Sequence, residues 1–436
     1  MSQIAAGHDH SHGHGDHHGH EPGYIAARKQ LDMGALTWSG GAISGLLMLI
    51  GVAGIAVTVF GAFSTAGDAP KAAQAHALAA YLMGFLFVMG LCLGSLGFQM
   101  ILQQFNAGWS AAPRRQAETI ASLSWVLLLL FVPIAYLELF QTKGLLFAWM
   151  DSAKTAGDPI FYAKKMWLNP TRWMIAAAIY FTVWISLGTV LYKLSRKQDE
   201  TGDRWITAKA RFISSFGLLL FALTTAFASF DWLMSLDYHW FSTMFGVYFF
   251  AGSIVSTVAM LCVVMCTLRI RGKFGATFTQ EHQHDLGKLL FAFTVFWAYV
   301  TFCQYFLIWY SNIPEESAFY VLRQNGDYMK VFTLLCWGHF VAPFLVLLVR
   351  KVKRNAQALR LVALWLLVMH AADLFFMVRP IVKSVPMGSN WWIDALGIAG
   401  PVFLFMGLVV WKMGKAPLVP IKDPRLDEVL AHKNYV

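Results

Sequence analysis

The chain has 436 residues, of which 57% are hydrophobic and 13% are charged, with a formal net charge of +10. Soluble domains carry about 25% charged residues, and disordered, collagen-like or disulfide-rich chains need compositions that this chain lacks. The mean hydropathy of +0.54 therefore indicates a polytopic membrane protein. We expect the basic excess to set its orientation in the membrane rather than to bind nucleic acid.

The first 35 residues form a separate low-complexity tail that holds half of the 14 histidines. These are His8, His10, His12, His14, His17, His18 and His20. Neutral imidazoles at such spacing can bind a divalent transition metal, whereas the competing interpretation is a disordered tail with incidental affinity. We predict a disordered cytoplasmic tail over residues 1–35.

Ten apolar segments follow in chain order, and each is long enough to cross a bilayer as a helix. They are residues 36–62, 76–104, 118–141, 173–192, 212–230, 241–268, 289–313, 331–349, 361–378 and 391–411. The prediction is an all-α polytopic membrane domain over 36–411. Residues 412–436 then form a C-terminal cytoplasmic tail that either docks on other subunits or is a solvated end.

The charges in the loops predict the orientation of the chain. With ten spans both termini share one side, and that side carries 24 of the 34 Lys and Arg residues. Because basic residues are retained in the cytoplasm, both termini are predicted to be cytoplasmic.

A faint internal repeat relates helices 2–5 to helices 6–9. Helices 4 and 8 both end in basic clusters, and helices 3 and 7 both run into polar loops with acidic residues near their ends. The repeat predicts two four-helix bundles, over about 76–230 and about 241–378, flanked by helices 1 and 10.

The five cysteines lie inside apolar runs and form no C-x-x-C pair. They are Cys92, Cys262, Cys266, Cys303 and Cys336. We interpret them as small core residues, without disulfides or iron–sulfur ligation.

Three ionisable residues lie at mid-membrane depth: His339 in helix 8, and His370 and Asp373 in helix 9. Because such groups are costly in lipid, each is a functional candidate. We predict one polar cluster that relays protons and is reached through Gln304 or Tyr299 on helix 7. The same residues are equally consistent with a hydrogen-bonded cluster that only holds the helices together. The two histidines are also consistent with axial ligation of a b-type haem.

A second polar set lies in the outer half of the membrane, near the ends of helices 3 and 5. Glu138, Asp231 and His239 lie there beside the aromatic residues Tyr136 and Trp232. Acidic groups can accept protons from a quinol and aromatic rings can stack on it, so these residues are quinone-site candidates. The aromatic residues also fit an interfacial belt.

Several longer motifs carry a family resemblance. They are Phe227-Ala-Ser-Phe-Asp-Trp-Leu-Met-Ser-Leu-Asp-Tyr-His-Trp-Phe-Ser-Thr, Tyr248-Phe-Phe-Ala-Gly-Ser, Trp309-Tyr-Ser-Asn-Ile-Pro-Glu-Glu, His339-Phe-Val-Ala-Pro-Phe and His370-Ala-Ala-Asp. Over about residues 30–412 the chain resembles the F subunits of bacterial alternative complex III, within the NrfD-like polysulfide-reductase membrane-subunit family.

The resemblance implies an inner-membrane subunit of a respiratory quinol:cytochrome c oxidoreductase. It implies menaquinone or ubiquinone as ligand, no cofactor in this chain itself, and haem c and iron–sulfur clusters in periplasmic partner subunits. Other implied partners are the paralogous C subunit, credited with quinol oxidation, lipid, and a terminal oxidase. The F subunit is expected to carry part of a proton path.

Two alternatives stay open at this point. One is an ion or solute transporter that works alone, which predicts interrupted helices at matched positions of the repeat. Pro133 and Pro343 interrupt helices 3 and 8, which are not matched. The other is a quinol-oxidising anchor of a different iron–sulfur or molybdenum oxidoreductase. No nucleotide-binding loop, Cys-rich cluster or catalytic serine motif is present in the sequence, so we expect no catalysis by the chain alone.

Overall fold

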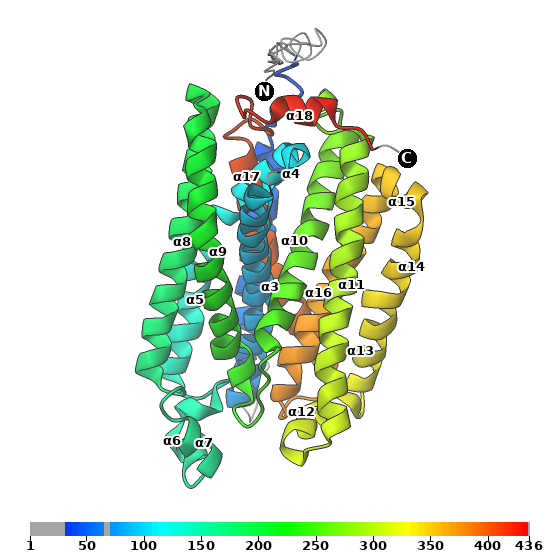
Figure 1. Ribbon diagram of the computed structural model, residues 1–436. Helices are drawn as coiled ribbons and strands as arrows, with labels where there is room; N and C mark the ends of the chain where they lie inside the picture. Colours follow the sequence, from blue (N-terminus) through cyan, green and yellow to red (C-terminus); the bar gives the residue numbers. More distant parts are fainter. Residues whose placement is uncertain (1–30, 65–69, 106, 435–436) are drawn as a thin grey trace, which may run out of the picture.

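The computed structural model describes residues 31–64, 70–105 and 107–434. Within these residues the protein is all-α, and ten helical segments are long and apolar enough to cross a membrane (Figure 1). The predicted fold class and the number of spans are confirmed. The seven histidines of the N-terminal tail lie outside the described residues.

Each span is one helix or two consecutive helical pieces. In chain order the spans are α2 (Gly41–Ser64), α3 (Pro70–Gln104), α4 with α5 (Ala111–Ala121 and Trp125–Tyr136), α8 (Pro170–Thr201), α9 (Arg204–Trp232), α10 (Phe245–Ile270), α11 (Gln280–Ser311), α13 with α14 (Tyr328–Leu334 and Ala342–Leu348), α16 (Ala356–Val378) and α17 (Trp391–Met413). Short helices lie between spans or after the last one: α6 (Ser152–Thr155), α7 (Pro159–Lys164), α12 (Pro314–Gln324), α15 (Arg350–Arg354) and α18 (Leu426–Ala431).

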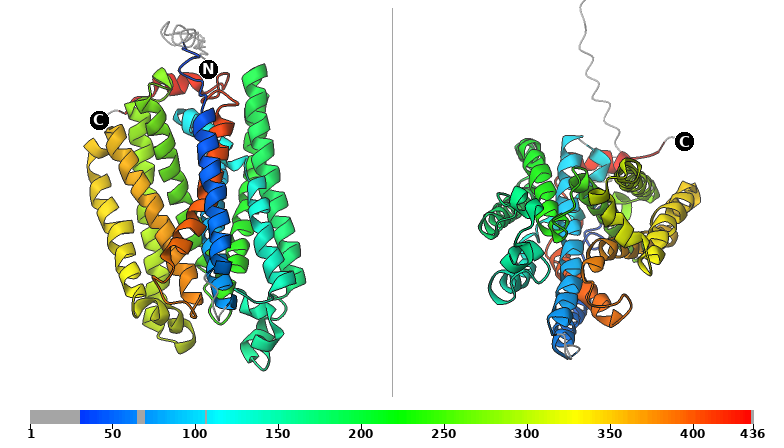
Figure 2. Two further views of the ribbon diagram at one scale, coloured as in Figure 1. Left: turned by 180° about the vertical axis from the view of Figure 1, so that it is seen from behind. Right: turned by 90° about the horizontal axis from the view of Figure 1, so that it is seen from below.

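The spans form two groups of four and a flanking pair (Figure 2). Helices α3, α4–α5, α8 and α9 pack on one another, and so do α10, α11, α13–α14 and α16. The first and last spans, α2 and α17, pack together and against α3. This is the predicted arrangement of two four-helix groups flanked by helices 1 and 10.

The two groups meet along α3 and α10, the two most buried spans. Gly94 of α3 allows this approach, because a Cβ atom there would lie 2.3 Å from the backbone oxygen of Ser253 on α10. Small residues at helix contacts serve the same purpose in membranes generally, where close packing replaces the hydrophobic effect.

The pairing of α2 with α17 also depends on glycine. A Cβ atom on Gly51 would lie 2.2 Å from the backbone nitrogen of Leu404, and one on Gly54 would lie 3.1 Å from Cα of Gly400. The rest of α2 is largely exposed along the flank of the bundle.

Two spans contain a π-helical segment beside a proline. Residues Leu137–Gln141 follow Pro133, and residues Leu335–Val341 precede Pro343. Proline lacks an N–H group and its ring crowds the carbonyl four residues earlier. For Pro343 that carbonyl belongs to His339, which lies inside the wider π turn, whereas the segment after Pro133 lies on the other side of its proline. The two segments lie in spans 3 and 8, which do not occupy matched positions of the predicted repeat.

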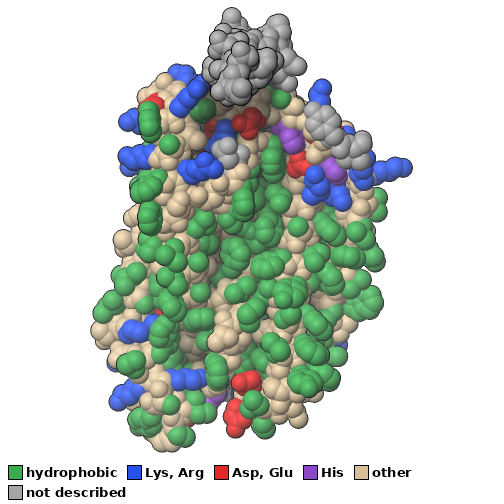
Figure 3. Space-filling view, viewed as in Figure 1, with side chains coloured by type: hydrophobic (Ala, Val, Ile, Leu, Met, Phe, Trp, Pro, Cys, Tyr) green, Lys and Arg blue, Asp and Glu red, His purple; other side chains and the backbone are tan. Residues whose placement is uncertain are grey.

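The first described residues and α18 lie at one end of the bundle, which we call the terminus end (Figure 1). The side surface between the ends is mainly hydrophobic, and charged side chains gather towards the two ends (Figure 3). This is the surface expected of a chain whose flank faces lipid.

The C-terminal tail packs on its own chain, so the prediction of a plain solvated end was wrong, whereas docking on other subunits stays a prediction. Its Leu418, Val419, Leu426 and Val429 are buried. Asp423 accepts a hydrogen bond from Arg114 of α4. Burial would raise the pKa of Asp423, but the positive charges of Arg114 and Arg425 outweigh this and lower it to about 2.

Candidate functional site

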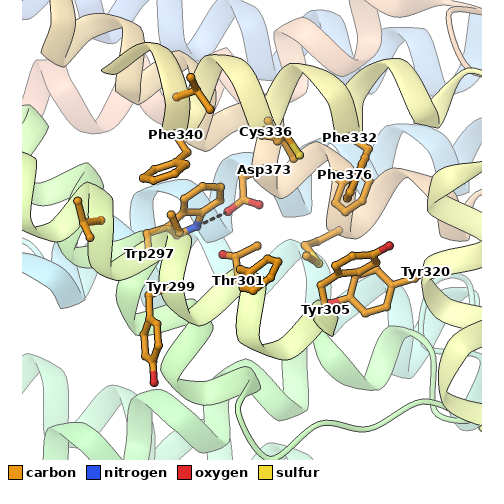
Figure 4. Close-up of a pocket in the computed structure, with 16 residues that line it drawn as sticks. Trp297, Tyr299, Thr301, Tyr305, Tyr320, Phe332, Cys336, Phe340, Asp373 and Phe376 are labelled. Atoms are coloured by element: carbon orange, nitrogen blue, oxygen red, sulfur yellow. Dashed lines mark hydrogen bonds between the residues drawn. The ribbon is translucent and has the colours of Figure 1, made fainter. Parts of the chain in front are cut away.

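A pocket of about 530 Å³ lies in the second four-helix group, between α11, α12, α16 and the span formed by α13 and α14 (Figure 4). Its walls are mostly aromatic or aliphatic, and they include Tyr305, Tyr320, Phe332, Phe340 and Phe376. Among the described residues that line it, Asp373 carries the only carboxylate.

The pocket opens on the lipid-facing flank. Tyr299 and Phe302, which line it, are 62% and 60% exposed, and Cys336 is also exposed. The lining residues on α11 and α16 lie in the halves of those helices away from the terminus end. A ligand dissolved in the bilayer would therefore enter sideways, in the half opposite the termini.

Asp373 is held by two aromatic donors. The Tyr248 hydroxyl of α10 donates to Oδ1, and the Trp297 indole N–H of α11 donates to Oδ2 at 3.3 Å. The residue is 3% exposed, and both bonds come from neutral groups. The acid is thus oriented without a neutralising cation, which leaves it able to take up or release a proton.

The two predicted histidines lie close to this acid without a direct hydrogen bond to it. The ring of His339 stacks on Trp297, with centroids 3.7 Å apart. His370 and Asp373 flank Gly252 of α10, where a Cβ atom would lie 3.4 Å from His370 Nδ1 and 3.9 Å from Asp373 Oδ2. Trp297 and Gly252 therefore connect the three residues that were predicted to form a cluster.

All four nitrogens of His339 and His370 are buried and have no hydrogen-bond partner among the described residues. They are covered by packed side chains: Phe87 lies 5.3 Å from His370 by ring centroids, and Trp297 covers a face of His339. This packing does not fit a porphyrin between the two rings. The residues present thus do not favour the haem interpretation.

The two access residues on α11 differ in orientation. Gln304 is buried, accepts from the Ser242 hydroxyl at 3.0 Å and donates to the Tyr320 hydroxyl at 3.1 Å. The side chain of Tyr299 points away from Asp373 (Figure 4). Gln304 therefore connects the pocket wall to the end of the bundle, whereas Tyr299 borders the mouth.

The quinone-site candidates of the first four-helix group are not brought together around a common space. Glu138 lies in the π-helical segment after α5 and is fully buried. Its carboxylate accepts from the backbone N–H groups of Leu145 at 3.1 Å and Leu146 at 2.7 Å. Tyr136, which is 57% exposed, points to the flank beside Phe140. Glu138 thus acts as a fixed anchor for its own loop.

Asp231 and Trp232 at the end of α9 also make contacts inside the bundle. Asp231 accepts from Arg172 and, at 2.9 Å, from the Tyr180 hydroxyl. Trp232 is fully buried in an aromatic cluster that includes Phe131 and Phe181. The carboxylate therefore already has a cation and a hydroxyl as partners.

His239 lies at the end of the bundle opposite the termini, in the turn before α10. Its Nε2 is 2.8 Å from Asp158 Oδ2, which also accepts from the Tyr238 hydroxyl at 2.7 Å. The bond from Tyr238, with that from His239, lowers the pKa of Asp158 to about 2 although partial desolvation opposes it. His239 therefore belongs to a hydrogen-bonded surface cluster with Asp158 and Tyr238, and it makes no contact with Glu138.

Sequence reasoning missed Trp297 and Tyr248, the two donors to Asp373. Trp297 is an aromatic residue inside an apolar run and gives no sequence signal, whereas Tyr248 stood out only as the first residue of a family motif, without a role. It also missed Thr301, a pocket-wall residue whose buried hydroxyl has no partner in the described part of the chain.

Neither the scan against protein-family models nor the search of curated proteins finds a match to this chain. The resemblance to the alternative complex III subunits stays a prediction. The site must be interpreted from its own geometry.

Proposed function

We propose that this chain is an integral membrane subunit of a respiratory quinol:cytochrome c oxidoreductase of the alternative complex III type. In this proposal the pocket beside Asp373 receives the quinol ring. The observation that supports it is a single carboxylate, held by neutral donors, in an aromatic pocket that opens to the lipid-facing flank.

The chemistry of a quinol matches that pocket. The quinol ring can stack on aromatic side chains while its isoprenoid tail remains in lipid. Each quinol hydroxyl needs a proton acceptor. Oxidation of one quinol to quinone releases two protons and two electrons. Asp373 accepts the first proton, passes it on and then accepts the second, and the two electrons pass to iron–sulfur or haem c centres that we expect in partner subunits.

Protons would then continue from Asp373 towards His370 and His339. The unpartnered ring nitrogens of these histidines support this extension, because a buried imidazole without a fixed partner can exchange a proton with water or a neighbour. The proposal also moves the expected quinone site from Glu138 and Asp231 to the second four-helix group.

The test compares two carboxylate-to-amide variants in the purified complex. Asp373→Asn keeps the shape of the side chain and removes its titration, and we expect quinol turnover to fall about 100-fold or more. Glu138→Gln, the matched control, should leave turnover within about threefold. If Glu138→Gln abolishes turnover and Asp373→Asn does not, the site lies in the first group and the present assignment is wrong.

Subunit composition tests the complex itself. The affinity-tagged chain should co-purify with haem c and iron–sulfur proteins. A transporter would instead purify alone and would bind no quinone analogue.

A further inference from the structure

A second hollow, of about 800 Å³, lies at the terminus end and has no part in the proposed quinol site. It is bounded by the end of α3, the first three turns of α9 and the C-terminal tail before and within α18. Its polar lining includes Gln103, Gln104, Arg204, Arg211, Arg425 and Glu428.

Three guanidinium groups line this hollow. The Arg204 side chain has no hydrogen-bond or ion-pair partner among the described residues, and Arg211 donates to the backbone oxygen of Gln104 at 3.0 Å. Arg425 is 5% exposed and donates to Gln103 Oε1 at 3.0 Å. Its Nη1 is buried and has no partner in the part of the chain that the structure describes.

One carboxylate also lines the hollow. Glu428 packs closely on Gly108, where a Cβ atom would lie 1.6 Å from its Oε2. The Glu428 charge offsets one guanidinium, and Arg425 also forms an ion pair with Asp423 at 3.4 Å. Arg204 and Arg211 have no such acidic partner among the described residues, so the lining keeps a net positive charge. The hollow therefore suits an anion.

The hollow continues into an apolar surface. Phe212, which lines it, is 66% exposed, and Phe216 one turn further along α9 is 62% exposed. Arg211 directly precedes the apolar run that begins at residue 212. A charged head between the arginines would thus have its tail along an exposed aromatic face of α9, at the depth where lipid headgroups meet acyl chains.

We propose that this hollow binds the phosphate headgroup of an anionic phospholipid of the phosphatidylglycerol or cardiolipin class. Basic pockets between helices at a membrane surface recognise such headgroups. The guanidinium groups bind the phosphodiester through charge-assisted hydrogen bonds, which suit their planar geometry. The lipid would also join α3, α9 and the C-terminal tail.

The experiment is a lipid titration of the delipidated full-length protein followed by native mass spectrometry. The ligands are phosphatidylglycerol, phosphatidylcholine and inorganic phosphate, each added alone. The test variant is Arg204→Gln with Arg211→Gln, both exposed positions that leave the core intact. The control is Lys197→Gln with Lys209→Gln, which removes the same charge from exposed positions of α8 and α9 that do not line the hollow.

We expect one tightly retained phosphatidylglycerol, whose apparent affinity falls about 30-fold in the arginine variant and stays within about threefold in the control. Equal retention of phosphatidylcholine would overturn the proposal, as would an equal loss in the lysine control. Binding of inorganic phosphate without any preference for phosphatidylglycerol would assign the hollow to a free anion instead of a lipid.

Discussion

The ring of His370 occupies a space that exists because position 252 has no side chain. A methyl group at position 252 would lie 3.1 Å from His370 Cε1, so the imidazole would have to shift by a few tenths of an ångström to admit it. Gly252 thus lets α10 approach the residues that we assign to proton transfer.

Gly252→Ala should therefore destabilise the protein by about 1–3 kcal/mol, because the added methyl group overpacks the core and displaces the imidazole. Thermal unfolding in detergent measures the effect. Gly45→Ala is the control: its Cβ would meet nothing within 4 Å, and a helical Gly-to-Ala change stabilises by up to about 1 kcal/mol. Equal changes in the unfolding temperature of both variants would mean that the space at Gly252 does not restrict the side chain there.

Cys336 gives the pocket a chemical reporter. Among the described cysteines it is the exposed one, and it lines the pocket, whereas Cys92, Cys262 and Cys266 are buried. A lipid-soluble maleimide should label Cys336, and a quinone analogue should slow that labelling about tenfold or more by occupying the pocket. Mass spectrometry of the digested protein locates the label.

The control for this experiment is Cys336→Ser, in which the labelling that the quinone analogue slows should be absent. If the rate at which Cys336 is labelled in the wild-type protein does not change at a saturating concentration of the analogue, the analogue binds elsewhere.

At the scale of elements, hydropathy predicted each span, but it predicted the helix ends poorly. The helix α9 begins at Arg204, eight residues before the predicted segment, and α11 begins at Gln280, nine residues before its own. Polar residues continue these helices beyond the apolar run because they hydrogen-bond within the terminus end. Asp203 and Thr279, for example, cap the two helices with their side chains.

The site was predicted in part. His339, His370 and Asp373 stood out because ionisable residues are rare in apolar runs, and the structure places them near one another. Which carboxylate faces an open pocket depends on the partners of each: backbone amides for Glu138, Arg172 for Asp231, and two aromatic donors for Asp373. Those partners depend on helix packing, which a single sequence does not specify.

The C-terminal tail should respond to acid through Asp423. The pKa of this carboxyl is about 2 in the folded protein and 3.8 ordinarily, so its stabilising effect is present above the ordinary value and is lost as pH falls through about 2. The shift corresponds to about 2 kcal/mol at neutral pH. Asp423→Asn at pH 7 should reproduce this loss and speed tryptic cleavage after Lys422.

Glu200→Gln is the control for the tail. Its side chain is exposed, and only its backbone oxygen accepts from Lys422. Cleavage should stay at the wild-type rate in this variant. If Asp423→Asn is cleaved no faster than wild type, other contacts hold the tail.

At the scale of the whole molecule, the predicted orientation can be tested at two exposed positions on opposite ends. His239 lies at the end opposite the termini, with its side chain 51% exposed, whereas Tyr238 beside it is buried. In a Cys336→Ser background, His239→Cys should react with an impermeant maleimide from outside the cell once partner subunits are removed. Glu200→Cys should react only after the membrane is permeabilised. The reverse pattern would place both termini outside.

The close pairing of α2 with α17 has a consequence for biogenesis. Among the described spans, the first in chain order has its glycine-lined partner in the last one, and eight other spans lie between them in the sequence. Until α17 has been made, the face of α2 that carries Gly51 and Gly54 lacks this partner. A chain truncated before α17 would then expose this face to quality-control proteases, which makes completion of the last helix a checkpoint for the whole fold.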